Sequence, residues 1–224
     1  MRYSHFENII SPDRLGRYLS SCGGDTRKAM TLYRRNLQLS QELFTLISCF
    51  EVALRNAIDQ HYTCTLGDHW LRDAAANGGR FNNRNCRFTG DSISDAIRKL
   101  NQSYTHNKLI AELGFGFWRY MFAKHQYNAC GKTLLRILPA KPRGVQYNQD
   151  FIFNRLQAIN EIRNRIAHHE PVCFVKGNSI KDTNYVRHHY QFLIEFFRWM
   201  CIDETALLFG LDHIHVVCNR IDAL

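Results

Sequence analysis

Apolar residues recur at three- and four-residue spacing between residues 25 and 61. This spacing places them on one face of an α-helix, and no proline or glycine interrupts it. Asp25 stands where an N-cap carboxylate accepts hydrogen bonds from the first turn. At about 1.5 Å per residue the helix would span roughly 50 Å or more. We therefore expect a scaffold helix of the kind that often carries a dimer surface. Its repeating positions are Leu32, Leu39, Leu43, Leu46, Phe50, Ala53, Leu54, Ala57 and Ile58.

Shorter periodic stretches predict further helices. Ser11 and Pro12 are a typical cap and first turn, and the helix they open stops at glycines 23 and 24. Asp91 and Asp150 each stand at the start of a later periodic stretch. Further helices are predicted over residues 91–103, 150–168 and 182–209. Residues 107–138 are predicted to be a helical region that Gly114 and Gly116 break or kink.

Strand-like patterning is confined to the short stretch 172–175. We therefore expect an all-α fold, a helical bundle with long scaffold helices, in a single domain over residues 1–224. Within it, residues 72–143 are predicted to form an additional helical and loop insert, and residues 150–209 the helices that follow. Large apolar residues at helical spacing are chiefly packing residues, so we expect the aromatic run after Gly114 and Gly116 to be core. That run comprises Phe115, Phe117, Trp118, Tyr120 and Phe122.

The composition is that of a soluble globular protein, with 45% hydrophobic and 22% charged residues. No apolar stretch approaches the roughly 20 residues that a membrane helix needs, and no apolar core follows a basic start at the N-terminus. The eight cysteines are spread along the chain without a C-x-x-C pair. We expect a cytoplasmic protein with reduced thiols, no membrane span, no signal peptide, no metal and no cofactor.

Positive charge is concentrated in residues 72–143, which carry 13 Lys and Arg against 4 Asp and Glu, a balance of +9 that equals the net charge of the chain. Within this segment Arg80, Arg84 and Arg87 alternate with Phe81 and Phe88 in a loop rich in Gly and Asn. Arginines neutralise phosphates and aromatic rings stack on bases, so the loop can bind RNA. A solvated loop kept basic for solubility is the alternative.

The sequence EIRNRIAHHEP, residues 161–171, holds the most suggestive chemistry. Asn164 and His168 are four residues apart on a predicted helix and share a face, and the long side chain of Arg163 can reach the same cleft. A histidine can move the protons of RNA cleavage by the ribose 2′-hydroxyl, while arginine stabilises the charge on the phosphorane. The helix dipole favours the protonated form of His168, which fits an acid role. The alternative is a helix capped by His168 and His169, with Arg163 paired to a surface acid.

These residues resemble the signature of HEPN domains, in which an Arg is followed by a polar residue and, after four to six positions, by a His. The flanking sequence is similar to one branch of that group, the Abi-like (abortive infection) proteins of bacteria. The similarity covers residues 11–199 and rests on landmarks in one order, PDRLGRYL, LFTLISCFEVALRNAID, HWL and LGFGFWRYMF.

The resemblance implies an all-helical HEPN-like fold and a dimeric ribonuclease-type site built from Arg163, Asn164 and His168. It also implies a role in defence against phage, with a small RNA or a protein antitoxin as a partner in some members. Since one motif supplies one well-placed imidazole, we expect a homodimer that brings two copies together. His169 offers a second imidazole without an assigned role.

A second segment fits the same loose motif, with Arg55 followed by Asn56 and His61. Arg55 stands among apolar positions, and a buried arginine needs a partner. We expect Glu51 and Arg55 to support the helix that carries Arg163; a second catalytic centre at Arg55 and His61 is the alternative.

Two functions from different classes remain open at this point. The first is a metal-independent endoribonuclease in phage defence that leaves a 2′,3′-cyclic phosphate and a 5′-hydroxyl. The second is an RNA-binding protein that holds a small structured RNA as a ribonucleoprotein without cutting it. A third interpretation has the motif only as a network that locks a dimer. The same residues bind phosphate whether or not it is cleaved, so the sequence does not separate them.

Overall fold

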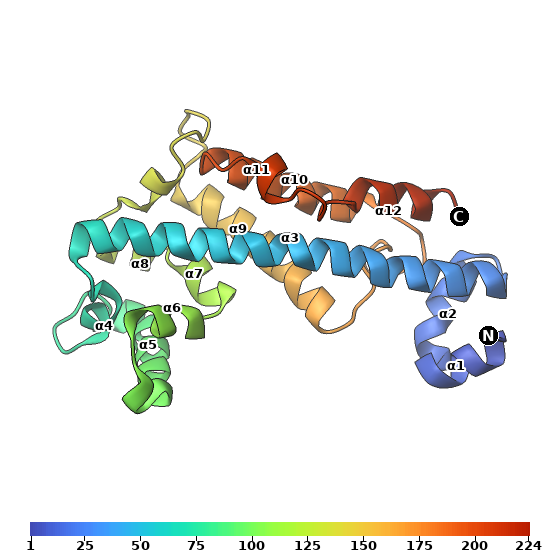
Figure 1. Ribbon diagram of the computed structural model, residues 1–224, viewed down its shortest axis with the longest axis horizontal. Helices are drawn as coiled ribbons and strands as arrows, with labels where there is room; N and C mark the ends of the chain where they lie inside the picture. Colours follow the sequence, from blue (N-terminus) through green and yellow to red (C-terminus); the bar gives the residue numbers. More distant parts are fainter. The chain divides into compact units, whose positions relative to one another are not determined.

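The computed structural model describes residues 1–224 and consists of twelve α-helices and three short 3₁₀-helices without a strand (Figure 1). The predicted all-α fold is therefore confirmed. The only β-pairing is an isolated antiparallel bridge between Phe174 and Lys181, where the backbone N–H of Val175 also donates to the carbonyl of Ile180. The strand-like stretch thus forms one edge of a short hairpin.

The chain divides into two compact units. Unit 1 contains Met1–Ser48, Glu161–Glu195 and Glu204–Leu224, and unit 2 contains Cys49–Asn160 and Phe196–Asp203. The prediction of a single domain over residues 1–224 stays a prediction.

Helix α3 (Thr26–Leu66) is the predicted long helix and contributes residues to each unit. The Asp25 carboxylate accepts hydrogen bonds from the backbone N–H groups of Arg27 and Lys28 at 2.9 and 3.0 Å, and these bonds lower its pKa. The predicted cap is therefore correct. The helix runs five residues beyond its predicted end and stops at Gly67, which has a positive φ of 100°.

Unit 1 begins with α1 (Tyr3–Ile10) and α2 (Pro12–Ser21), which lie against each other (Figure 1). Ser11 caps α2 through a hydrogen bond from the N–H of Arg14, as predicted. The ring of Tyr18 packs edge-on against Tyr33 of α3 and against Phe174, with centroids 5.2 and 5.0 Å apart. An aromatic core thereby holds α2, α3 and the hairpin together.

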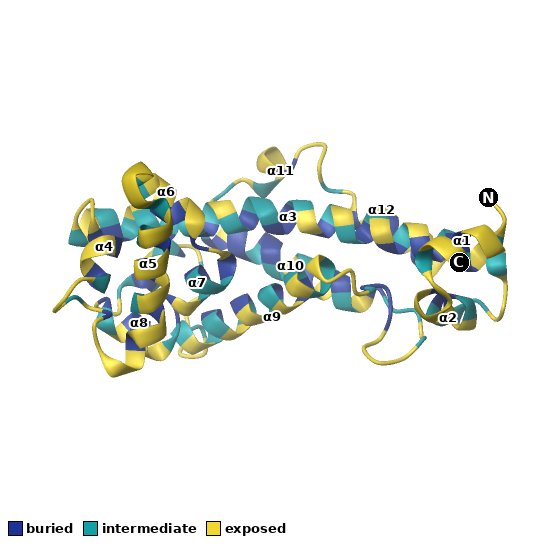
Figure 2. Ribbon diagram, turned by 90° about the horizontal axis from the view of Figure 1, so that it is seen from below, coloured by how far each residue is buried: buried dark blue, intermediate teal, exposed yellow.

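Unit 2 contains residues 72–143, which the sequence predicts to form an insert. The helices of this region are α4 (Trp70–Ala75), η1 (Arg84–Cys86), α5 (Arg87–Leu100), η2 (Asn101–Ser103), α6 (His106–Glu112), α7 (Phe115–Tyr120), α8 (Lys124–Ala129) and η3 (Leu134–Ile137). The carboxylate of Asp59 accepts hydrogen bonds from the ring N–H groups of Trp70 and His106, each at 2.8 Å. These two bonds tie α4 and α6 to α3. Helix α5 packs on α4 and α6 and turns a largely exposed face outward (Figure 2).

Two predicted helix starts are wrong. Helix α5 begins at Arg87, not at Asp91, because the side chain of Asn83 caps the preceding 3₁₀ turn and the chain continues from that turn into α5. Helix α9 (Gln149–Ala167) is capped by Asn148, whose side-chain oxygen accepts the N–H of Phe151 at 3.0 Å. Asp150 lies inside its first turn.

The last predicted helix is also too long. Helix α10 (Asn184–Trp199) ends ten residues before Phe209, because the chain turns at Cys201, which has a positive φ of 58°. The N–H of Cys201 donates to the carbonyl of Arg198, and the N–H of Ile202 donates to that of Phe197, which closes the helix end. Two further helices follow, α11 (Glu204–Leu207) and α12 (Ile214–Asp222).

The aromatic run is only partly core. Phe115, Trp118 and Phe122 are buried as predicted, but Phe117 is half-buried and Tyr120 is 46% exposed. Four of these rings lie on α7, where Phe115 and Trp118 take the buried face while Phe117 and Tyr120 lie on more exposed faces. All eight cysteines are free thiols. None of the helices combines the length and the hydropathy that crossing a bilayer requires.

Candidate functional site

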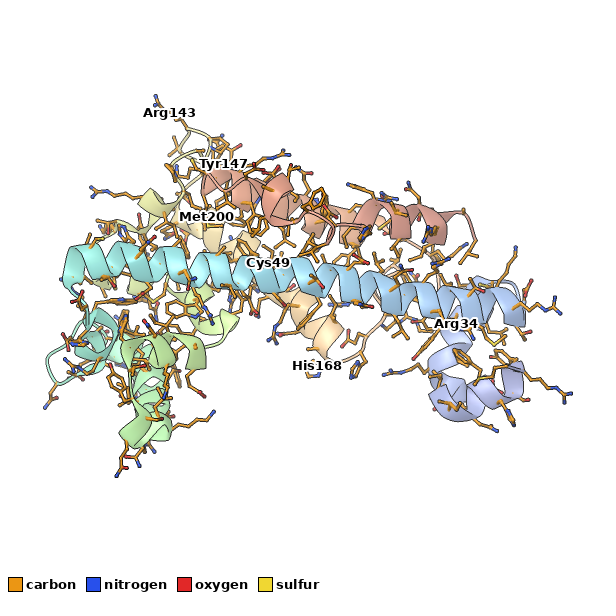
Figure 3. All side chains as sticks on the ribbon, in the orientation of Figure 1. Arg34, Cys49, Arg143, Tyr147, His168 and Met200 are labelled. Atoms are coloured by element: carbon orange, nitrogen blue, oxygen red, sulfur yellow. The ribbon has the colours of Figure 1, made fainter.

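The predicted Arg-Asn-His motif occupies the last turn of α9, within unit 1. Arg163 is half-buried, whereas Asn164 and His168 are exposed. The backbone N–H of His168 donates to the carbonyl of Asn164 at 2.9 Å, so the two residues are one helical turn apart. His168 projects from the end of α9 (Figure 3). Both residues thus lie at the end of α9, and their convergence with Arg163 on one cleft stays a prediction.

The helix ends immediately afterwards in a Schellman turn. The N–H of Glu170 donates to the carbonyl of Arg165 at 2.8 Å, and the N–H of His169 donates to that of Ile166 at 2.9 Å. His169 takes the left-handed position of this turn, with φ of 57°. Glycine is the usual residue there, because a Cβ atom makes this conformation unfavourable.

The side chain of Arg165 holds the chain after the turn in place. Its Nη2 donates to the carbonyl of Pro171 at 2.6 Å, its Nε lies 3.5 Å from a carboxylate oxygen of Glu170, and its guanidinium stacks 4.8 Å from the ring centroid of Tyr185. Sequence reasoning missed this residue. The signal available was a second arginine in RNRIAHHEP, two residues after the first.

A second anchor comes from α3. Asn36 is 4% exposed, and its Oδ1 accepts the backbone N–H groups of Val172 and Cys173 at 2.9 and 3.2 Å. A single buried amide therefore fixes the segment that follows the motif. Sequence reasoning missed Asn36 as well, since a polar residue in a helix does not reveal a partner that is 136 residues away.

Arg14, Arg17, Asn36, His169 and Glu170 are among the residues that line a cavity of about 190 Å³ beside the turn. In this cavity the imidazole of His169 lies with the guanidinium groups of Arg14 and Arg17. These two cationic groups can attract a phosphate. It is His169, and not His168, that faces this cavity.

Burial favours the neutral forms of two titratable side chains in the same unit as the motif, Cys173 and His189. Burial raises the pKa of the Cys173 thiol to about 12. Burial also lowers the pKa of His189, whose Nδ1 donates to the carbonyl of Tyr185 at 2.7 Å. His168 and His169 are the exposed imidazoles of this helix end. No group of three or more His, Cys, Asp and Glu side chains gathers in the arrangement a metal ion needs.

His169→Gly is expected to raise the free energy of unfolding by up to about 1 kcal/mol, because glycine takes a positive φ without strain. Urea unfolding followed by circular dichroism measures this change. His168→Gly is the matched control and should bring no gain, since the φ of His168 is not positive. A loss of stability in His169→Gly would mean that the imidazole makes stabilising contacts that outweigh the strain.

The second motif lies in unit 2, on α3. Glu51 and Arg55 are half-buried and one turn apart, and the Nε of Arg55 is buried without a hydrogen bond. His61 bonds to the hydroxyl of Thr133 at 2.8 Å, and its pKa is lowered by burial and by Arg136. His61 lines a cavity with Asn56 but without Arg55, so the alternative centre at Arg55 and His61 gains no support. The supporting role of Glu51 and Arg55 stays a prediction.

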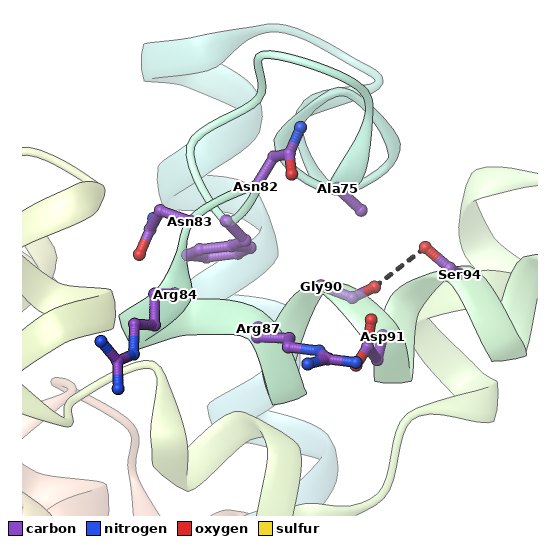
Figure 4. Close-up of a pocket in the computed structure, with 9 residues that line it drawn as sticks. Ala75, Asn82, Asn83, Arg84, Arg87, Gly90, Asp91 and Ser94 are labelled. Carbon is purple, nitrogen blue, oxygen red and sulfur yellow. Dashed lines mark hydrogen bonds and ion pairs between the residues drawn. The ribbon is translucent and has the colours of Figure 1, made fainter.

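The basic loop is also in unit 2. Arg80 donates to the carbonyl of Ala129 at 3.0 Å, and Arg87 lies 3.5 Å from the Asp91 carboxylate. Arg84 makes no hydrogen bond or ion pair, and with Arg87 it lines a cavity of about 350 Å³ (Figure 4).

The two phenylalanines of this loop differ. Phe81 is 1% exposed, so the expectation that it stacks on a base is wrong: it is a core residue. Phe88 is 87% exposed.

Fold and site together define an all-α protein that displays an Arg-Asn-His group at the end of a helix. The family model described as Abi-like protein matches residues 2–173, and the chain belongs to that family. Membership in this family supports the conclusion that the chain is a bacterial abortive-infection protein. No curated protein and no solved structure gives a significant match to the chain.

Proposed function

We propose that the protein is a cytoplasmic, metal-independent endoribonuclease of the HEPN type that acts in defence against phage. The observation that carries this proposal is the last turn of α9, where exposed Asn164 and His168 stand beside Arg163 on a rigidly anchored helix end. Rigid placement matters because proton transfer and charge stabilisation both depend on geometry.

The reaction uses the 2′-hydroxyl of RNA as its own nucleophile. A neutral imidazole removes the hydroxyl proton, the oxygen attacks phosphorus, and the 5′-oxygen leaves with a proton from a protonated imidazole. The products are a 2′,3′-cyclic phosphate and a 5′-hydroxyl. Arg163 stabilises the extra negative charge of the phosphorane, and Asn164 orients the phosphate through its amide.

Two proton carriers are needed, and a homodimer would supply two copies of His168 at one cleft. Mixing Arg163→Ala chains with His168→Ala chains tests this arrangement. If both imidazoles are needed, these heterodimers stay inactive like the two parent variants. Heterodimers that regain activity would instead show a shared site in which one complete Arg-His set suffices. A protein that is monomeric by light scattering at micromolar concentration yet fully active would contradict the dimeric site.

The central experiment is to purify the chain from cells, identify any RNA that co-elutes, and incubate that RNA with the protein in EDTA. Cleavage with cyclic phosphate ends is expected. A strict requirement for magnesium would rule out the proposed chemistry.

RNA binding without cleavage is the second candidate, and the exposed Arg84 favours it because this guanidinium has no protein partner. In that case the same experiment returns intact, bound RNA. A protein antitoxin as a further partner stays a prediction.

Arg84→Glu is expected to weaken RNA binding and to flatten the plot of log affinity against log salt by about 0.7 for the lost contact with a single strand. Arg98→Glu on α5 is the control, because Arg98 already pairs with Asp95. Fluorescence anisotropy at several salt concentrations measures both. An unchanged slope in Arg84→Glu would place the RNA elsewhere.

A further inference from the structure

Three aromatic rings gather at one cavity of about 460 Å³ in unit 2. Phe88 comes from the first turn of α5, while Phe117 and Tyr120 come from α7. Phe88 is 87% exposed and Tyr120 is 46% exposed. Single exposed apolar residues are ordinary, but three rings around one hollow mark a binding surface.

The cavity also has a buried polar group. Gln126 is 6% exposed, and its Nε2 donates to the hydroxyl of Thr89 at 2.8 Å. Its Oε1 accepts no hydrogen bond, and turning the amide over would leave Nε2 without one instead. The Oε1 atom is not fully enclosed by protein, so a ligand in the cavity can reach it. Gln126 therefore offers one hydrogen bond to a ligand in the cavity that it lines.

Positive charge lies along the same segment. Residues 84, 87, 91 and 94 line the basic cavity of Figure 4, whereas residues 85, 88, 89 and 92 line the aromatic one. The two sets of residues are offset by about one position along the chain, so they lie on neighbouring faces of the same helical segment. Arg84 and Arg87 are thus within one turn of Phe88.

We propose that the aromatic cavity binds an unpaired nucleobase of an RNA strand whose phosphates contact Arg84 and Arg87. Aromatic rings stack on the faces of unpaired bases, amides read base edges, and arginines neutralise the backbone. An aromatic pocket beside the unpaired Arg84 and the exposed Arg87, which also lies 3.5 Å from Asp91, fits the base and the phosphate of a nucleotide. This inference rests on the proposed action on RNA, and it names single-stranded RNA as the form that is bound.

The test measures binding alone, so that it is independent of cleavage. The probe is a short single-stranded RNA with 2′-O-methyl groups, which block the attack by the 2′-oxygen, and with 2-aminopurine as a fluorescent base. Binding to the unaltered protein is expected to quench the fluorescence by stacking. A blunt-ended RNA duplex, which has no unpaired base, is expected to bind more weakly.

Phe88→Ala is expected to lower the affinity for the single strand by about 5- to 150-fold, the range for the loss of one stacked base. Phe209→Ala is the matched control, because Phe209 is also 87% exposed. Gly116→Met is a second variant that keeps Phe88. A Cβ atom at Gly116 meets nothing within 4 Å, so the new side chain should occupy the cavity without disturbing the fold, and it should weaken binding too.

Affinities of Phe88→Ala and Gly116→Met equal to that of the unaltered protein would overturn the base pocket, as expected if Phe88 serves a protein partner. A protein that binds neither RNA would overturn the pocket together with the proposed action on RNA. Quenching that depends on Phe88, in a protein that leaves unmodified RNA intact, would support the pocket and refute only the ribonuclease activity.

Discussion

His168→Ala is expected to lower the rate of RNA cleavage by about 10²- to 10⁴-fold, the usual contribution of a general acid or base. The side chain is exposed at the end of α9, so its removal leaves no cavity in the core. Thermal unfolding should therefore be unchanged, and toxicity in cells should disappear together with cleavage. Gel analysis of a labelled RNA gives the rate.

The control for this variant is His5→Ala, which removes another exposed imidazole from the same unit. It should leave the rate unchanged. Equal cleavage by the unaltered protein and by His168→Ala would contradict the proposed role of His168. A parallel loss of stability and activity would assign the motif a structural role instead.

Asn36→Ala is expected to lower the free energy of unfolding by about 2 to 6 kcal/mol. It removes the one acceptor of two buried N–H groups, on Val172 and Cys173, and each buried donor left unpaired costs about 1 to 3 kcal/mol. Because the freed segment follows the motif directly, cleavage should fall as well. Urea unfolding followed by circular dichroism measures the stability.

Gln41→Ala on the same helix is the matched control, because Gln41 is exposed and its side chain makes no hydrogen bond. Its effect should stay within about 0.5 kcal/mol. Similar stabilities of the two variants would show that Asn36 does not anchor the segment.

Local signals in the sequence predicted several features correctly. The caps Ser11 and Asp25 act through atoms within three residues of themselves, so their identity suffices to place a helix start. The Arg-Asn-His spacing likewise depends only on the pitch of α9. The long helix followed from apolar periodicity uninterrupted by proline or glycine.

Other features depended on contacts far apart in the chain. Phe81 and Phe88 look equivalent in the sequence, but one is buried and the other is exposed. The end of α10 at Cys201 lacks the glycine that normally announces such a turn. His169 likewise occupies a left-handed position without being glycine.

By itself, then, the amino-acid sequence determined the all-α class, the long helix, the excess charge of residues 72–143 and the position of the motif on a helix end. Each of these depends on residues within a few turns of one another. Only the tertiary structure decided that Asn36 anchors the segment after the motif, that His169 faces a cavity with Arg14 and Arg17, and that Phe88 lines one cavity with residues of α7. Those contacts join residues distant in sequence, and their formation depends on how the whole unit buries its apolar surface.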